Sequence, residues 1–267
     1  NCIFFIIYKM NKKQLNTISN KLVNAFTKNK IIKPIPRKFC KNIKNSDHLR
    51  KVCESKIKWP VVGFKAGGTA IPLLKKLKEK EPFYASVYRK NFLQSGKKVK
   101  INKYTLGIEL EVCYLIKKNF FLSKQRISKK NILKFISHMA PCLEIVGYRQ
   151  RKNGVKFLGD LCSDFGANVK FLIGKKKKFK KINIANLKTF ILTTINKKKI
   201  VGNTKSVYGN PINSLYFVLK KIKKDKIFLN KDFYVFTGST VGIVPIEKKR
   251  TYIGKINKIG SVKTIIY

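Results

Sequence analysis

The spacing of the apolar residues changes at Pro82, and this change constrains the fold more than any other feature. Before it, Leu15, Leu22 and Phe26 recur at helical spacing, which predicts an amphipathic helix over residues 12–28. After it, short apolar runs alternate with turn residues and predict strands. No apolar run approaches the roughly 20 residues that cross a bilayer, so a membrane-spanning protein is not expected. The order predicts an α+β fold, with helices early and two helices inserted into a strand-rich body.

The remaining elements follow from the same patterns. Helices are predicted over Asp47–Ser55, Ile71–Lys80, Lys129–His138 and Pro211–Lys223. Strands are predicted over Val61–Gly68 and over 83–117, 141–149, 168–173, 182–202, 233–246 and 251–267, with a solvated basic loop at 174–181.

The first residues stand apart. The chain begins with Asn1, and we expect residues 1–9 to lie upstream of an initiator at Met10, so they are left out of the fold prediction. We expect an N-terminal helical region over 10–80 and a strand-rich core over 81–267, together forming one compact unit.

The chain is unusually basic: it has 61 Lys and Arg but only 12 Asp and Glu, which gives a formal net charge of +49. One interpretation is a nucleic-acid-binding protein. The other is codon bias, which the composition favours, because only seven of the basic residues are Arg and the lysines are spread along the whole chain. We therefore expect no specific nucleic-acid partner.

The cysteines and histidines argue against several chemistries. No two of the six cysteines have C-x-x-C spacing, and the chain has only two histidines, so a zinc site is not expected. Reduced, buried thiols in a cytoplasmic protein are the expectation. The sequence also lacks a P-loop, a G-x-G-x-x-G turn after a strand and a G-x-S-x-G elbow.

Acidic residues inside apolar strands are informative in a chain with so few acids. Glu109 and Glu111 lie in GIELEVCYLI, where alternate residues of a strand share one face, and Glu144 lies in CLEIVG. Carboxylates this close repel one another unless a cation lies between them. Their oxygens suit a hard ion, Mg²⁺ or Mn²⁺. The alternative is a solvated strand face on which the acids pair with lysines.

Two further segments could carry chemistry. Lys65 lies in GFKAGGT (63–69), where it could neutralise a substrate carboxylate or act as a base, although 54 lysines make an incidental position a strong alternative. The turn in FTGSTVG (236–242) could hold an anion on its backbone N–H groups, or be a plain tight turn.

These motifs, in this order, resemble the 2-keto-4-pentenoate hydratase group of the fumarylacetoacetate hydrolase superfamily. The resemblance runs from about residue 20 to the C-terminus. It rests on GFKAGGT, GIELEVCYLI and CLEIVGYR, and on EPFYASVY (81–88), GDLCSDFGANVKFLIG (159–174), VYGNPINSLYFVLKKI (207–222), FLNKDFYVFTGSTVGIVPI (228–246) and IGSVKTIIY (259–267).

The resemblance implies a mixed β-roll core behind an N-terminal helical region. It implies Mg²⁺ or Mn²⁺ on Glu109, Glu111 and Glu144, and a small 2-oxo acid chelated by the metal. It implies a hydro-lyase of aromatic catabolism that adds water to a 2-hydroxy-2,4-dienoate to give a 4-hydroxy-2-oxo acid, and a homo-oligomer. Catalytic roles are implied for Lys65 and Glu81, and substrate-binding roles for Thr69, Asp164, Thr237 and Ser239.

Some positions depart from the pattern. Lys80 stands where many members have Asp, which leaves Glu81 as the substitute, and Phe165 stands where many have Asn. A 2-oxo-diacid decarboxylase and an acylpyruvate hydrolase share the motifs and stay open as alternatives. From another class, a polyanion-binding protein with a decayed site also stays open.

Overall fold

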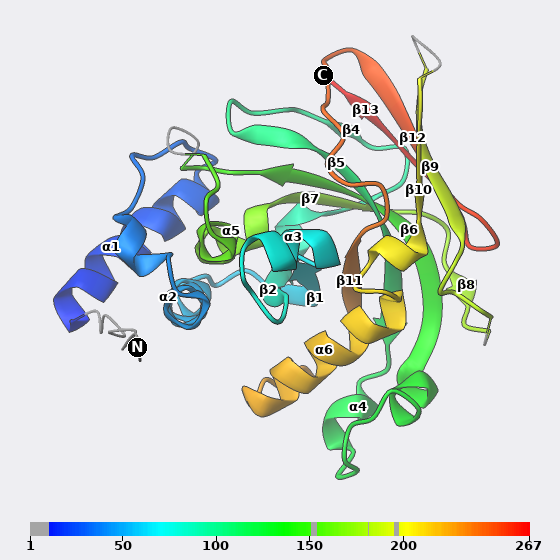
Figure 1. Cartoon of the computed structure of the whole chain (residues 1–267), viewed down its shortest axis with the longest axis horizontal. Coiled ribbons are helices and arrows are strands. Elements are labelled where there is room, and N and C mark those ends of the chain that lie inside the picture. Colours follow the sequence, from blue (N-terminus) through cyan, green and yellow to red (C-terminus); the bar gives the residue numbers. More distant parts are fainter. Residues whose placement is uncertain (1–10, 151–153, 181, 195–197) are drawn as a thin grey trace.

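The computed structural model describes residues 11–150, 154–180, 182–194 and 198–267, so the expectation for residues 1–9 lies outside it. Figure 1 shows two curved sheets with helices gathered on one side. The larger sheet has the order β2-β1-β11-β5-β6-β7-β3, with β8 beside β6, and the smaller has the order β10-β9-β12-β13-β4. The predicted α+β class is confirmed.

The strands have the following bounds. The larger sheet contains β1 (Val61–Gly67), β2 (Phe83–Tyr88), β3 (Phe92–Gln94), β5 (Thr105–Ile116), β6 (Ile136–Gly147), β7 (Asn168–Ile173), β8 (Lys177–Lys178) and β11 (Phe233–Ser239). The smaller contains β4 (Lys98–Val99), β9 (Lys188–Thr193), β10 (Lys199–Asn203), β12 (Arg250–Ile256) and β13 (Gly260–Ile266).

The helices are α1 (Lys12–Thr27), α2 (Ile43–Ser55), α3 (Ile71–Lys76), α4 (Asn119–Leu122), α5 (Leu158–Ser163) and α6 (Pro211–Lys224). Each of the three long helices starts at an asparagine whose side-chain oxygen accepts a backbone N–H of the first turn: Asn11, Asn42 and Asn210. In α6 a proline follows at the first position, where its missing N–H costs nothing.

Several boundaries differ from the prediction. The segment predicted as a helix over Lys129–His138 holds only a 3₁₀ turn, Asn131–Phe135, because from Ile136 onward the chain pairs with β5. The helix predicted over Ile71–Lys80 ends at Lys76, and α2 begins four residues before Asp47. The short helices α4 and α5 and the two-residue strand β8 were not predicted.

The larger sheet curls until its distant strands touch. Phe171 on β7 contacts Phe236 on β11 at 4.5 Å between ring centroids, although β5 and β6 lie between these strands. At the edge, the Asn168 side-chain amide donates to the Ser86 carbonyl on β2 at 2.9 Å. The sheet is therefore a roll with an inner face and an outer face.

The two faces of β5 have different surroundings. Ile108, Leu110 and Val112 point outward into the main core, which the smaller sheet and α6 cover with residues such as Ile191 and Leu215. Glu109 and Glu111 alternate with them and point into the roll, as the period of two requires. The predicted separation of acids from apolar residues on this strand is confirmed.

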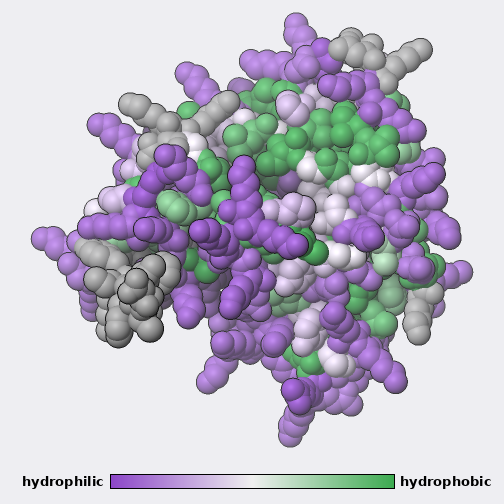
Figure 2. All heavy atoms as spheres, viewed as in Figure 1, coloured by the Kyte–Doolittle hydropathy of each residue, from purple (hydrophilic) through white to green (hydrophobic). Residues whose placement is uncertain are grey.

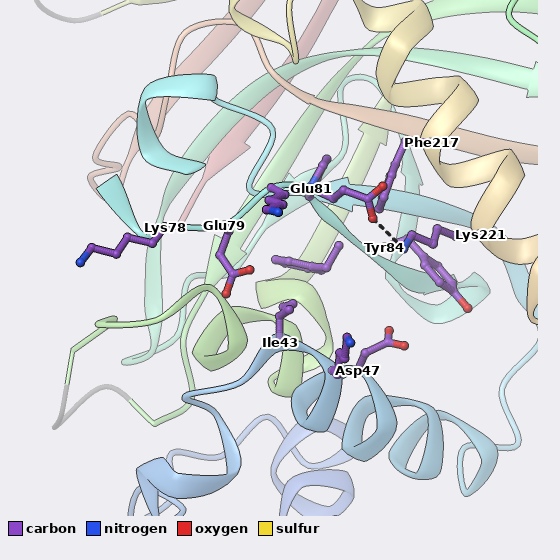
Figure 3. Close-up of a pocket in the computed structure, with 12 residues that line it drawn as sticks. Ile43, Asp47, Lys78, Glu79, Glu81, Tyr84, Phe217 and Lys221 are labelled. Carbon is purple, nitrogen blue, oxygen red and sulfur yellow. Dashed lines mark ion pairs between the residues drawn. The ribbon is translucent and has the colours of Figure 1, made fainter. Parts of the chain in front are cut away.

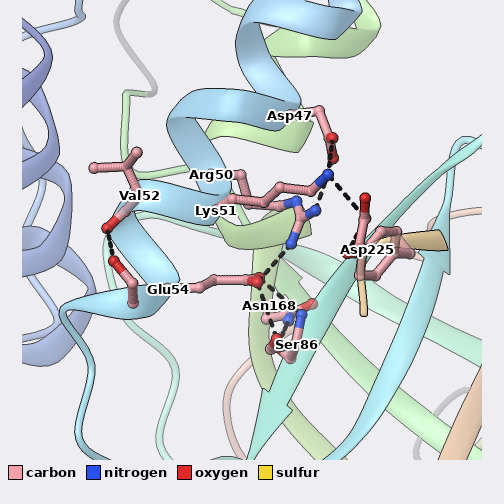
Figure 4. A network of polar contacts seen from close by, with 10 residues as sticks. Asp47, Arg50, Lys51, Val52, Glu54, Ser86, Asn168 and Asp225 are labelled. Atoms are coloured by element: carbon pink, nitrogen blue, oxygen red, sulfur yellow. Dashed lines mark hydrogen bonds and ion pairs between the residues drawn. The ribbon is translucent and has the colours of Figure 1, made fainter. Parts of the chain in front are cut away.

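A polar network joins α2 to the edge of the roll and to the end of α6 (Figure 4). The buried Arg50 pairs with Asp47 at 2.7 Å and with Glu54, which also accepts from the backbone and hydroxyl of Ser86. Lys51 bridges Asp47 to Asp225 at 2.9 and 2.8 Å. Three of the twelve acids, Asp47, Glu54 and Asp225, are used here, and they fix the helical region against the strands.

The surface is mostly hydrophilic, but Figure 2 shows an apolar patch at its upper right, where Figure 1 draws β4, β5 and β13. Across the described ranges, every helix is too short or too polar to cross a bilayer. The cysteines in these ranges, Cys40, Cys53, Cys113, Cys142 and Cys162, are free and buried, as predicted.

Candidate metal centre

Three carboxylates meet on the inner face of the roll. Glu109 on β5 lies directly opposite Glu144 on the antiparallel strand β6, and Glu111 follows two residues along β5, opposite Ser239 of β11. One oxygen from each carboxylate lies within 4.8 Å of the others. The structure thus brings the two glutamates of the Glu-x-Glu strand together with the separate glutamate at position 144.

Burial makes this cluster electrostatically costly without a cation. Glu111 and Glu144 are fully buried. Burial and then Glu144 raise the pKa of Glu109 to about 7, and burial raises the pKa of Glu111 to about 7. Burial also raises the pKa of Glu144 well above its usual value.

The acids also have oxygens without partners. Both carboxylate oxygens of Glu111 and Oε2 of Glu144 are buried and have no hydrogen-bond partner within the described chain. Buried polar atoms without partners are rare, and a bound ion is one of the partners that can satisfy them. Carboxylate oxygens are the donors that Mg²⁺ and Mn²⁺ prefer, so these residues fit such an ion.

Lys65 lies beside the acids. It projects from β1, which runs parallel to β11 in the roll, and its Nζ donates to Glu144 Oε1 at 2.6 Å and to the Gly166 carbonyl at 3.0 Å. Burial alone would lower the pKa of Lys65, but Glu144, Glu111 and Glu109 raise it. The lysine is therefore a charged group at the base of the site, and not one of the solvated lysines.

A strained turn presents the Gly166 carbonyl to Lys65. Phe165, Gly166 and Ala167 all have positive φ angles, of 54°, 69° and 62°. Such angles are unfavourable for the two residues with a Cβ, so the surroundings must hold them. The Phe165 ring stacks on Phe26 of α1 with centroids 4.1 Å apart. The residue that departs from the resemblance thus ties the N-terminal helix to the site.

An open cavity of about 600 Å³ leads to this base. Its lining includes Lys65, Glu109, Thr69 and Ser239, which were predicted as site residues. Thr69 lies against Gly238, where any Cβ would come within 2.1 Å of the threonine Oγ1, and the Gly238 φ of 104° also favours glycine. The predicted turn after β11 therefore lies at the cavity, although its anion-binding role is not tested.

Two other predicted site residues, Thr237 and Asp164, do not line this cavity. The Thr237 hydroxyl is buried and donates to the Val112 carbonyl at 2.8 Å. Asp164 pairs with the buried Arg149 and accepts its backbone N–H at 2.6 Å. Neither lines the cavity, and both hold the surrounding chain in place.

Glu81 lines a different cavity, between α2, the 78–84 segment and α6 (Figure 3). Its carboxylate is 54% exposed and pairs with Lys221 at 2.8 Å. Among the described lining residues, Phe83 alone is shared by the two cavities. The structure does not bring Glu81 to Lys65.

The Gly166 carbonyl and the apolar rim of the cavity (Leu73, Leu161, Val201 and Ile243) were not predicted. A backbone carbonyl leaves no residue-type signal. The rim residues come from four separate segments, and only the fold assembles them.

No protein-family model matches this sequence, and no curated protein is detectably similar to it. Solved structures do match. The 4-oxalocrotonate decarboxylase of Pseudomonas putida G7, complexed with magnesium and adipate, has a TM-score of 0.84 and 16% identity, covering 97% of this chain and 99% of that one.

More distant matches have the same architecture. Fumarylpyruvate hydrolase from Pseudomonas aeruginosa, in complex with Mn²⁺ and pyruvate, has a TM-score of 0.58 and 12% identity over 79% of this chain and 91% of that one. A Yersinia pestis CO92 protein provisionally assigned to the fumarylacetoacetate hydrolase family has a TM-score of 0.58 and 17% identity, over 79% and 95%. The predicted fold is thus confirmed: the chain has the mixed α+β fold with curled sheets of the fumarylacetoacetate hydrolase superfamily.

Proposed function

We propose that the protein is a divalent-metal-dependent hydratase that adds water to a 2-hydroxy-2,4-dienoate to give a 4-hydroxy-2-oxo acid. The observation that carries the proposal is the cluster of three carboxylates, two of them fully buried, with Lys65 2.6 Å from Glu144, at the base of an open cavity. The divalent ions named in the neighbouring structures support the metal.

Glu109, Glu111 and Glu144 would hold Mg²⁺ or Mn²⁺. The ion supplies a Lewis acid that polarises a 2-oxo acid and stabilises enolate charge. In the reaction a proton moves from the 2-hydroxyl oxygen to carbon, and H and OH of water then add across the remaining double bond.

Lys65 is the proposed proton carrier and partner of substrate charge. Its Nζ lies between Glu144 and the Gly166 carbonyl, which fix its direction at the base of the cavity. Thr69 and Ser239 line the same space and are proposed to position the substrate. We propose no catalytic role for Glu81, because its carboxylate lies in the other cavity.

A second candidate is decarboxylation of a 2-oxo-diacid of the 4-oxalocrotonate type. The observation favouring it is the match to the decarboxylase over nearly the whole of both chains. An acylpyruvate hydrolase is favoured less, because the fumarylpyruvate hydrolase match covers less of this chain. The non-enzymatic alternative, polyanion binding, has only the net charge in its favour.

The proposal extends to the setting of the enzyme. Free, buried thiols support a cytoplasmic location. A homo-oligomer is proposed from the family resemblance, and size-exclusion chromatography with light scattering tests it.

Absorbance of freshly prepared 2-hydroxypenta-2,4-dienoate tests the function. We expect loss of the dienol band with Mg²⁺ or Mn²⁺, no loss with chelator or in Glu109→Gln, and 4-hydroxy-2-oxopentanoate as product. Metal binding without hydration, together with CO₂ release from 4-oxalocrotonate, would favour the decarboxylase. Absence of both metal binding and turnover would favour the polyanion-binding alternative.

A further inference from the structure

The charged side chains of the cavity lie at its base. Lys65 is 3% exposed and already paired with Glu144, and the carboxylate of Glu109 belongs to the metal cluster. The described lining residues include no other lysine and no arginine or histidine. This is unusual for a chain in which 61 of 267 residues are basic.

Four other polar side chains that line the cavity, those of Asn203, Ser206, Ser239 and Thr240, are already hydrogen-bonded within the protein. The hydroxyl of Ser206 donates to the carbonyls of Asn203 and Ser239, and that of Ser239 donates to the Gly242 carbonyl. Thr240 donates to the Leu110 carbonyl, and the Asn203 amide donates to Asn186. The hydroxyls of Ser206, Ser239 and Thr240 therefore have no free proton to donate to a second substrate carboxylate.

Apolar side chains form the rest of the mouth. Val201 is 65% exposed, Ile243 52% and Leu73 36%, and Leu161 is half-buried. They come from β10, the turn after β11, α3 and α5. Exposed aliphatic residues gathered around one cavity mark a surface that gains free energy when covered.

We infer that this mouth selects the distal end of the substrate: the cavity takes 2-oxo acids with an apolar, uncharged tail and rejects diacids. The inference rests on the proposed function, which places the 2-oxo acid head at the base. A tail along Leu73, Val201 and Ile243 buries apolar surface, whereas a second carboxylate there would lose hydration without meeting a cation.

Binding of saturated 2-oxo acids to the Mn²⁺-loaded protein, by isothermal titration calorimetry, tests the inference without turnover. From 2-oxobutanoate to 2-oxohexanoate we expect Kd to tighten about two- to fourfold for each CH₂. The decisive pair is 2-oxohexanoate and 2-oxoadipate, which differ only by a terminal methyl in place of a carboxylate. We expect the diacid to bind at least about tenfold more weakly.

The comparison of these two acids is a strict test, because the net charge of +49 would by itself favour binding of the dianion, which is opposite to the preference we expect. Raising the salt from about 0.15 M to about 1 M screens that field and should widen the difference between the two acids.

Two variants provide a matched control. Val201→Lys places a cation at the mouth and should narrow or reverse the preference. Leu122→Lys adds the same charge at a side chain that is 69% exposed on α4, away from the cavity, and should leave the preference unchanged.

Two results would overturn the inference. If short 2-oxo acids bind but the series shows no gain with length, or the diacid binds as well as 2-oxohexanoate, the inference fails alone. If no 2-oxo acid binds to the metal-loaded protein, the proposed function fails and the inference fails with it.

Discussion

Glu109 and Glu144 lie directly opposite each other on the paired strands β5 and β6. The apolar residues next to them on each strand point to the opposite face of the sheet. Two carboxylates at directly opposed positions destabilise a sheet unless something neutralises them. Lys65 offsets one charge, and Glu111 adds a third. The cluster therefore has an excess of negative charge that a divalent cation would balance.

The first prediction concerns the metal. Glu109→Gln and Glu111→Gln should each weaken Mn²⁺ binding at least tenfold, about 1.4 kcal/mol, because a neutral amide is a poorer ligand for a hard ion. Neither should unfold the protein, since each removes a buried charge. Calorimetry and circular dichroism measure the two effects. Glu79→Gln, in the other cavity, is the control. Unchanged affinity in both variants would refute the metal site.

A second prediction concerns the buried ion pair. Lys65→Met should destabilise the metal-free protein by about 3–5 kcal/mol, because it leaves the buried carboxyl of Glu144 without its cationic partner. Lys65→Met combined with Glu144→Gln should recover most of that loss. Urea unfolding of the two single variants and the double variant gives the coupling. Additive effects would mean that the pair contributes nothing.

The third prediction concerns pH. The folded protein holds protons on Glu109 and Glu111 up to about pH 7, whereas the unfolded chain releases them near its ordinary values, so folding takes up protons in between. The stability of the metal-free protein should therefore fall as pH rises from about 4.5 to about 7. Mn²⁺ competes with those protons, so its stabilising effect should grow over the same range.

Thermal unfolding with chelator and with Mn²⁺, across this pH range, measures both trends. The double variant Glu109→Gln with Glu111→Gln should show a flatter pH dependence than the natural protein. The prediction is contradicted if the stability of the metal-free natural protein rises toward pH 7 and the double variant shows the same slope.

The sequence predicted what depends on local period. The acids on β5 appear as i and i+2 in an apolar strand, and α6 appears as Leu215, Val218 and Ile222 on one face of a helix. The helix predicted over 129–138 failed because its apolar residues satisfy a strand as well, and pairing with β5 decided the outcome.

The site itself required tertiary information. Glu81 lies only two residues before β2, a strand of the same roll, yet its carboxylate lines the other cavity. Asp164 and Thr237 flank site segments in the sequence, but Arg149 and the Val112 carbonyl occupy their polar atoms. No single-sequence pattern distinguishes a side chain that lines a cavity from one that supports its wall.

The last prediction concerns the link between the N-terminal helical region and the core. The Arg149 guanidinium lies between the rings of Phe26 and Tyr104, 4.8 and 4.9 Å from their centroids, and pairs with Asp164 at 3.1 Å. Arg149→Met should destabilise the protein by about 3–5 kcal/mol, because the fully buried carboxyl of Asp164 loses its cationic partner. It should also weaken 2-oxo acid binding more than Mn²⁺ binding, since Asp164 precedes the strained turn that orients Lys65 and does not touch the acids.

If residues 10–80 and the core form one unit, unfolding of the natural protein shows one transition by fluorescence of Trp59 and by circular dichroism. Two separate transitions would show instead that the helical region unfolds on its own. In that case Arg149→Met would shift only the transition that Trp59 fluorescence reports.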